Sequence, residues 1–318
     1  MIVAKGCASA VSSQPPSSGR PADQRLRGIA LRIGAVCSFS IMFALTKLAS
    51  DHRVTTAEII FYRNLFGLPV LALWIAIGPG IAAARMNVPM KHFTRAVIGL
   101  TSLWLNLTAI AMLPLADATA IGFMSPLFAT LLSAVVLRES VGPHRWAALA
   151  IGLAGVLLIV KPGGHSIAPV AFAFALGGAL GVAAVTVTIR QIALTETATA
   201  TVLWFSLISI ALLAIPVMLT GTAHDPVVWA LLAALAMFGA MGQMMMTASL
   251  RHAPVSVLAP LEYLQLIWAT GLGWMLWRAV PDPITLAGAA LIAAGGIYTI
   301  YREHRLHRER IGAGPPPA

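Results

Sequence analysis

Long apolar stretches joined by short polar connections fill most of the chain. Ten of them can be placed, at about residues 28–50, 57–78, 95–113, 116–137, 144–160, 168–190, 198–219, 227–249, 254–277 and 284–301. Each has about the 20 apolar residues that a helix needs to cross the hydrocarbon core of a bilayer. The pattern therefore predicts an all-α integral membrane protein with ten transmembrane helices.

Composition supports this class. Charged residues make up 10% of the chain and hydrophobic residues 58%, with a mean hydropathy of +0.85, whereas about a quarter of an ordinary soluble domain is charged. A net charge of +10 would suggest nucleic-acid binding in a soluble protein. In a membrane protein, the positions of the basic residues instead indicate which loops face the cytoplasm. We therefore expect the chain to contact the lipid bilayer and not to bind nucleic acid.

The distribution of lysine and arginine predicts the orientation. With a cytoplasmic N-terminus, sixteen of the 21 basic residues fall in cytoplasmic segments and three, Arg53, Lys161 and Arg278, fall outside. Such a bias follows the positive-inside rule. We therefore expect a multi-pass membrane protein with both termini in the cytoplasm.

Two parts of the chain resemble each other. Residues 254–296 align with residues 114–156 without a gap, and ten of the 43 aligned positions are identical. The alignment pairs Phe123 with Tyr263. We interpret this as a duplicated unit. Each copy holds five spans, an odd number, so the second copy would be inverted in the membrane, as in many secondary carriers.

The duplication predicts four segments. Residues 1–27 form a disordered basic cytoplasmic tail, 28–162 a first five-span repeat, 168–301 a second, and 302–318 a basic cytoplasmic tail.

Several motifs resemble the drug/metabolite transporter superfamily, in its ten-span branch built from two EamA-type domains. They are FYRNLFGLPVLAL in the second span, SPLFATLLSAVVLRES and WAALAIGLAGVLLIVKPG closing the first unit, and LAPLEYLQLIWATGLGWMLWRAVPD with GAALIAAGGIYTIYRE closing the second. The ninth span is similar to S-adenosylmethionine uptake carriers and to riboflavin carriers. One departure is Ala279, where the family usually has an acidic residue like Glu139. The resemblance, which covers about residues 28–303, implies a carrier of a small organic metabolite in the bacterial inner membrane that works by alternating access.

Glu262 is the main candidate for chemistry, because it lies in the ninth apolar stretch. Counted from Pro254 along a helix, it is about 12 Å inside the membrane, where an ionised group is costly. The copy in the first unit has Gly122 at this position. Glu262 would bind a proton or a substrate cation; alternatively, Lys47 or Arg63 neutralises it in a structural ion pair.

Other candidates for the binding site are amide and aromatic residues within the spans. Asn106 and Gln243 could contact substrate or form hydrogen bonds between helices. Tyr263, Trp104 and Trp268 could line a cavity and stack on a planar or cationic ligand, or pack as structural aromatics.

Four charged residues near the outer ends of the first two spans are candidates for a gate or for charge pairs. Lys47 and Asp51 are four residues apart and share a helix face, and Glu58 and Arg63 lie in the next span. Lys47 and Arg63 could equally extend to the lipid headgroups.

Catalytic, metal-binding and cofactor-binding motifs are not found. All eight histidines fall in predicted loops or tails, and there is no HExxH or Walker sequence. We expect no catalytic residue, metal or cofactor, and therefore no enzyme. The alternatives to a transporter are a non-transporting sensor or assembly protein and a membrane-embedded lipid-modifying enzyme. A second copy of the chain, as a homodimer, is a candidate partner.

Overall fold

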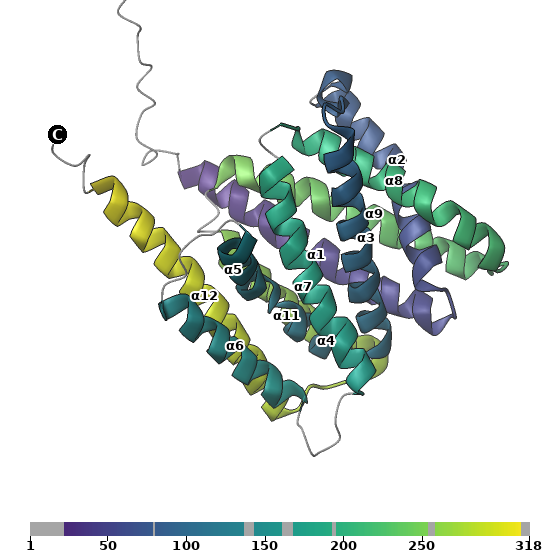
Figure 1. Cartoon of the computed structure of the whole chain (residues 1–318). Helices are drawn as coiled ribbons and strands as arrows, with labels where there is room; N and C mark the ends of the chain where they lie inside the picture. The colour runs from purple at the N-terminus through teal and green to yellow at the C-terminus, as the bar shows by residue number, and fades with distance from the viewer. Residues whose placement is uncertain are drawn as a thin grey trace, which may run out of the picture.

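The computed structural model describes residues 22–78, 80–136, 143–160, 168–192, 195–253 and 258–312. Within these ranges the chain consists of helices and short connections, with no strand (Figure 1). The helices are α1 (Ala22–Asp51), α2 (Thr56–Ile77), η1 (Ile81–Ala84), α3 (Pro89–Met112), α4 (Leu115–Gly122), α5 (Ser125–Val136), α6 (Pro143–Val160), α7 (Pro169–Ile192), α8 (Ala198–Thr220), α9 (Pro226–His252), η2 (Ala259–Tyr263), α11 (Leu264–Trp277) and α12 (Pro283–Gly312).

Six of these helices, α1, α2, α3, α7, α8 and α9, are long and apolar enough to cross a membrane. Shorter apolar helical segments lie at Leu115–Ala129, which includes the break between α4 and α5, and at Ala150–Ile159 and Pro283–Gly295. The chain is thus an all-helical, multi-pass membrane protein as predicted, whereas the count of ten spans stays a prediction.

The fourth predicted span is broken rather than continuous. It forms α4 and α5, separated by Phe123 and Met124, and the Met124 N–H bonds to the carbonyl of Ile121 in a tight turn. An unbroken helix would need an N–H at position 126 to bond the carbonyl of Gly122, and Pro126 has none. The ninth predicted span is also irregular, since the short 3₁₀ helix η2 precedes α11.

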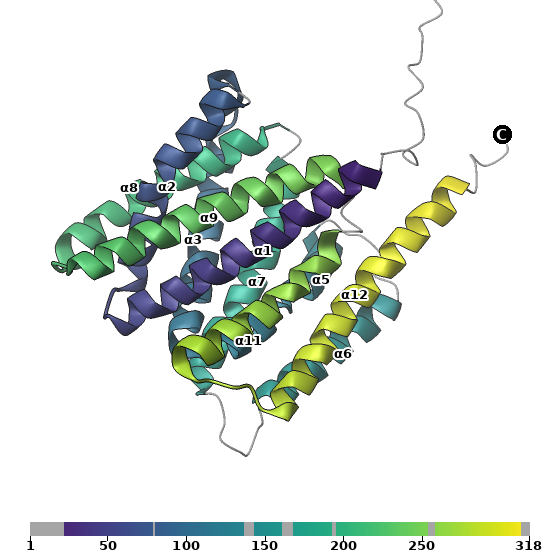
Figure 2. The same ribbon diagram turned by 180° about the vertical axis from the view of Figure 1, so that it is seen from behind.

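The packing of helices follows a pattern that treats the two halves alike. α1 packs along α9, and α3 along α7; α2 contacts α9, and α8 contacts α3; α11 contacts α1, and α5 contacts α7 (Figure 2). The exchange of halves replaces α1 by α7, α2 by α8, α3 by α9, α4 and α5 by α11, and α6 by α12, and the reverse. It converts the first contact of each pair into the second, and it leaves the contacts α2–α8, α4–α11 and α6–α12 unchanged. This pattern supports the predicted relation between the halves, although the inversion itself stays a prediction.

The pair α6 and α12 forms one side of the molecule in both views (Figures 1 and 2). The two helices touch through their backbones: a Cβ on Gly155 would lie 2.5 Å from the carbonyl oxygen of Gly288, and a Cβ on Gly288 would lie 2.5 Å from that of Gly155. Small residues at such crossings allow close packing where lipid removes the hydrophobic driving force.

Candidate functional site

An ion pair joins Glu262 of η2 to Arg32, which lies within the apolar part of α1. The Arg32 Nη2 donates to Glu262 Oε1; the arginine side chain is 6% exposed and the carboxylate 44%. Arg32 lies six residues after Leu26, where the apolar part of α1 begins, which is about 9 Å along a helix. This depth is similar to that expected for Glu262. The ion-pair partner of Glu262 is thus Arg32, and not Lys47 or Arg63.

Several donors beside Glu262 are free. The Nε and Nη1 of Arg32 and the hydroxyl of Tyr263 are buried and have no hydrogen-bond partner among the described residues. Unbonded buried donors are costly, so each can gain from an acceptor on a ligand. A carboxylate that is partly accessible, beside a guanidinium with unused donors, can exchange its ion pair for a proton or for a charged group of a substrate.

The ring of Tyr263 packs against that of Phe123, with centroids 4.9 Å apart and planes inclined by 58°. These are the two residues that the internal alignment pairs. If the halves are related as predicted, equivalent residues that touch each other would lie near the axis between them. The ring contact brings together the segments where the fourth and ninth predicted spans are broken, and discontinuous helices form binding sites in many carriers.

Lys47 and Asp51 hold the far end of α1. The Lys47 Nζ donates to the carbonyls of Ile110 (3.1 Å) and Leu113 (2.7 Å) at the C-terminus of α3, where a cation is favoured. The same ammonium lies 5.8 Å from the centroid of the Trp277 ring, and Trp277 Nε1 donates to Asp51 Oδ2 at 2.7 Å. These contacts tie α1, α3 and α11 together.

Glu58 and Arg63 lie on α2 and face α9. Glu58 is 1% exposed, completes a capping box with Thr55, and lies 2.9 Å from Nε2 of His224. Arg63 packs beside Gly239, since a Cβ there would lie 3.4 Å from Arg63 Nε. Among the described residues, Arg63 forms no ion pair with Glu262, whose partner is Arg32.

The remaining predicted residues are spread over the helices. Trp104 and Trp268 are exposed, at 38% and 40%, and Gln243 is exposed on α9. In the described part of the chain, none of the three makes a hydrogen bond or ring contact with Glu262 or Tyr263. The structure thus groups only Glu262 and Tyr263 of these candidates, and a role for the others in binding stays a prediction.

Asn106 lies in the contact between α3 and α7. Its Cα is 3.0 Å from where a Cβ on Gly178 would be. This close approach explains why a small residue stands at position 178. Asn106 therefore has a packing role here, beside any role in binding.

Arg32 is the residue of this site that the sequence did not single out. It counted only toward the basic residues on the cytoplasmic side. The signal that could have found it is its depth, since it lies inside the first apolar stretch at about the depth of Glu262. Within the described ranges, no group of three His, Cys, Asp or Glu residues could hold a metal ion.

Relatives of known function are carriers. The chain is 34% identical over 272 residues to the pseudopaline exporter CntI of Pseudomonas aeruginosa strain UCBPP-PA14. The alignment covers 85% of this chain and 94% of that protein. It is 28% identical to the riboflavin transporter of Rhizobium johnstonii (86% and 90% covered) and 26% identical to the S-adenosylmethionine uptake transporter of Rickettsia bellii (81% and 88%).

A solved crystal structure shares the fold, with a TM-score of 0.54, 22% identity, and coverage of 89% of this chain and 97% of the other. The family model described as the EamA-like transporter family matches twice, at residues 26–161 and 170–301. These two matches cover most of the chain, and it belongs to the EamA-like transporter family.

Proposed function

We propose that this chain carries a small organic metabolite across the bacterial inner membrane by alternating access, with proton coupling through Glu262. The observation that carries the proposal is the Arg32–Glu262 ion pair beside the break in the ninth predicted span. Three named relatives are carriers of small organic molecules, which agrees with the expectation that the chain is not an enzyme.

Glu262 supplies a site whose occupancy can differ between the two faces of the carrier. A ligand shifts a conformational equilibrium only if it binds the two states unequally. Protonation of Glu262 would break its ion pair with Arg32 and free the guanidinium for an acceptor on the substrate. The state with the ion pair and the state with bound substrate would then differ in charge distribution.

The proposed architecture is two inverted repeats, residues 28–162 and 168–301, with both termini in the cytoplasm. The matched helix contacts support this arrangement, as does the contact between Phe123 and Tyr263. In it, α1 and α7 begin on opposite faces of the membrane. The ends where α3 and α8 begin would be cytoplasmic, and the ends where α2 and α9 begin periplasmic.

Transport by purified protein in lipid vesicles tests the proposal. S-adenosylmethionine, riboflavin and pseudopaline are the first ligands for a thermal-shift screen, because a ligand that binds the native state raises the melting temperature. Uptake of the ligand that binds is then measured with and without a pH gradient. We expect Glu262→Gln, which keeps the size of the side chain and removes its titration, to abolish pH-driven accumulation.

Asp51→Asn is the matched control, since it changes a carboxylate to an amide at the far end of α1. It should preserve the response to the pH gradient. Normal accumulation by the Glu262→Gln variant at every gradient would show that Glu262 does not couple transport to protons. The absence of any saturable uptake across a broad metabolite library would contradict the transporter itself.

A further inference from the structure

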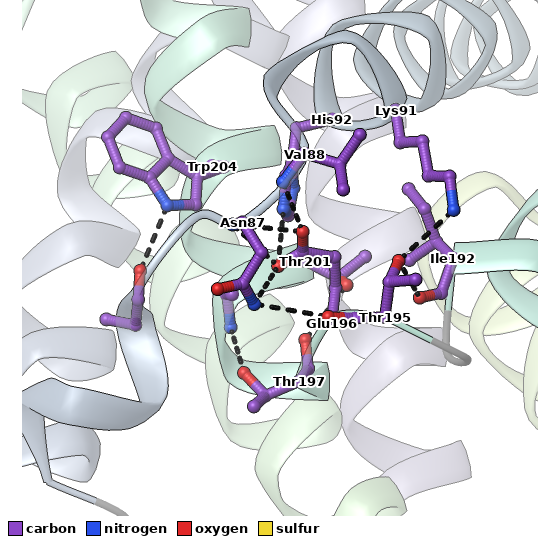
Figure 3. Close-up of polar contacts among 12 residues, drawn as sticks. Asn87, Val88, Lys91, His92, Ile192, Thr195, Glu196, Thr197, Thr201 and Trp204 are labelled. Carbon is purple, nitrogen blue, oxygen red and sulfur yellow. Dashed lines mark hydrogen bonds and ion pairs between the residues drawn. The ribbon is translucent and has the colours of Figure 1, made fainter.

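Two buried carboxylates lie where helices of the two halves begin. The first is Glu196, whose side chain is fully buried between the end of α7 and the start of α8 (Figure 3). It accepts hydrogen bonds from the N–H of Asn87 (3.0 Å) and of Val88 (2.6 Å), immediately before α3, and lies 3.2 Å from Nε2 of His92. We call Asn87, Val88, His92 and Glu196 the Glu196 lock.

The sequence placed His92 in a loop, but the structure places it in the first turn of α3 with 1% of its surface exposed. Lys91, beside it, donates to the hydroxyl of Thr195 at 3.2 Å. These contacts fix the start of α3 to the connection between α7 and α8. Glu196 therefore binds one predicted repeat to the other.

A matching arrangement surrounds Glu58. This carboxylate, in the first turn of α2, accepts from the N–H of Thr55 (2.9 Å) and from the N–H of Thr222 (3.3 Å), and lies 2.9 Å from Nε2 of His224. Thr222 and His224 belong to the connection that leads into α9. We call Thr55, Glu58, Thr222 and His224 the Glu58 lock.

Each lock places a carboxylate beside a helix N-terminus and bonds it to a connecting segment of the other half. The first N–H groups of a helix lack partners within it, and the helix dipole makes this end positive. Glu196 precedes the N-cap Thr197 of α8 and accepts from the N-cap Val88 of α3. Glu58 lies in the first turn of α2 and accepts from Thr222, in the connection before α9. A buried carboxylate with these donors is stable where it is, but removing its partners would be costly.

The two locks lie at opposite ends of the helices, because α3 and α8 begin at one end and α2 and α9 at the other (Figures 1 and 2). Each crosses the boundary between the halves. We propose that the Glu196 lock and the Glu58 lock are the two gates of the carrier, so that opening either face breaks the lock at that face and retains the other. This proposal rests on the alternating-access function proposed above.

Hydrogen–deuterium exchange on the full chain in lipid nanodiscs tests the gates, since it reads the amides that form the locks. Glu196→Gln should speed exchange at Asn87 and Val88 and slow it at Thr222, as molecules shift toward the state open at the Glu196 end. Glu58→Gln should do the reverse. We expect the acceleration at the weakened lock to be roughly tenfold, the effect of losing one hydrogen bond to a charged group, and the slowing at the distant lock to be smaller.

The slowing at the distant lock is the informative result, because a carboxylate that only stabilises its own surroundings cannot produce it. Asp282→Asn is the matched control. Asp282 accepts a hydrogen bond from the Thr285 N–H at 2.7 Å beside the start of α12, and its replacement should leave the exchange rates at both locks unchanged. If Glu196→Gln does not fold, His92→Asn weakens the same lock while leaving its backbone hydrogen bonds.

Faster exchange at both locks in each variant, or no change at the distant lock, would refute the gates and make the carboxylates fixed structural links. This test needs no substrate. A chain that transports none of the tested metabolites but shows reciprocal exchange would retain its gates, whereas the proposed cargo would be wrong.

Discussion

Replacing Gly155 by alanine tests the backbone contact between α6 and α12. The added Cβ would lie 2.5 Å from the carbonyl oxygen of Gly288 and 2.8 Å from Cγ1 of Ile292. The first of these atoms is backbone, so a side-chain rotation cannot relieve the clash and the helices must separate. Overpacking of this kind costs about 1 to 3 kcal/mol, and the better helix propensity of alanine returns up to about 1 kcal/mol.

Gly271→Ala is the matched control, because a Cβ there meets nothing within 4 Å. Only the gain in propensity applies to it. We therefore expect the Gly155→Ala variant to unfold at a temperature several degrees below that of Gly271→Ala, as measured by thermal unfolding in detergent. Gly155→Val should lower the temperature further. Equal melting temperatures for the two alanine variants would refute the close crossing of α6 and α12.

Three further predictions concern the ends of the helices. Burial alone would raise the pKa of Glu196, but His92 and two backbone N–H groups outweigh it and hold the pKa below its ordinary value of 4.5. The stability that Glu196 contributes is thus complete above about pH 4.5 and is lost as the pH falls through the lower folded pKa. Melting temperatures measured from about pH 3 to about pH 7, a range that brackets the pKa typical of glutamate, should fall less on acidification in Glu196→Gln than in the unmodified chain. An unchanged pH profile would contradict this. The Thr197 hydroxyl caps α8 by accepting from the Ala200 N–H and donates to the Ala83 carbonyl, so Thr197→Ala should cost at least about 1 kcal/mol. Equal loss in Thr186→Ala, where the hydroxyl bonds only within its helix, would argue against these contacts. A reporter fused after Arg310 should be active only in the cytoplasm, and periplasmic activity would remove the proposed inversion.

The helical plan could be predicted from the sequence because hydropathy and proline act locally. Pro114 marks the boundary between α3 and α4, and Pro226 and Pro283 begin α9 and α12. The break after α4 was missed, although Pro126 signals it, because the surrounding residues are apolar enough to read as one span. Hydropathy measures the environment of a segment and does not report the loss of a single backbone hydrogen bond.

The candidate site was only partly predictable. The cost of a charge in the membrane pointed to Glu262, but its partner is 230 residues away, and no local pattern links it to Arg32. Glu196 was missed because a carboxylate in a short connection ordinarily faces water. Its burial depends on the start of α3, more than a hundred residues earlier in the chain.

The two locks place their carboxylates at different positions of the two halves. When the helix caps Thr55 and Thr197 are aligned, Glu58 stands opposite Ala200, and Glu196 stands opposite Val54. Neither carboxylate therefore has an acidic counterpart at the matching position of the other half. Because the two positions differ, a substitution can strengthen one lock without touching the other. If the locks act as the proposed gates, such a substitution changes which face is closed at rest while the helical framework stays the same.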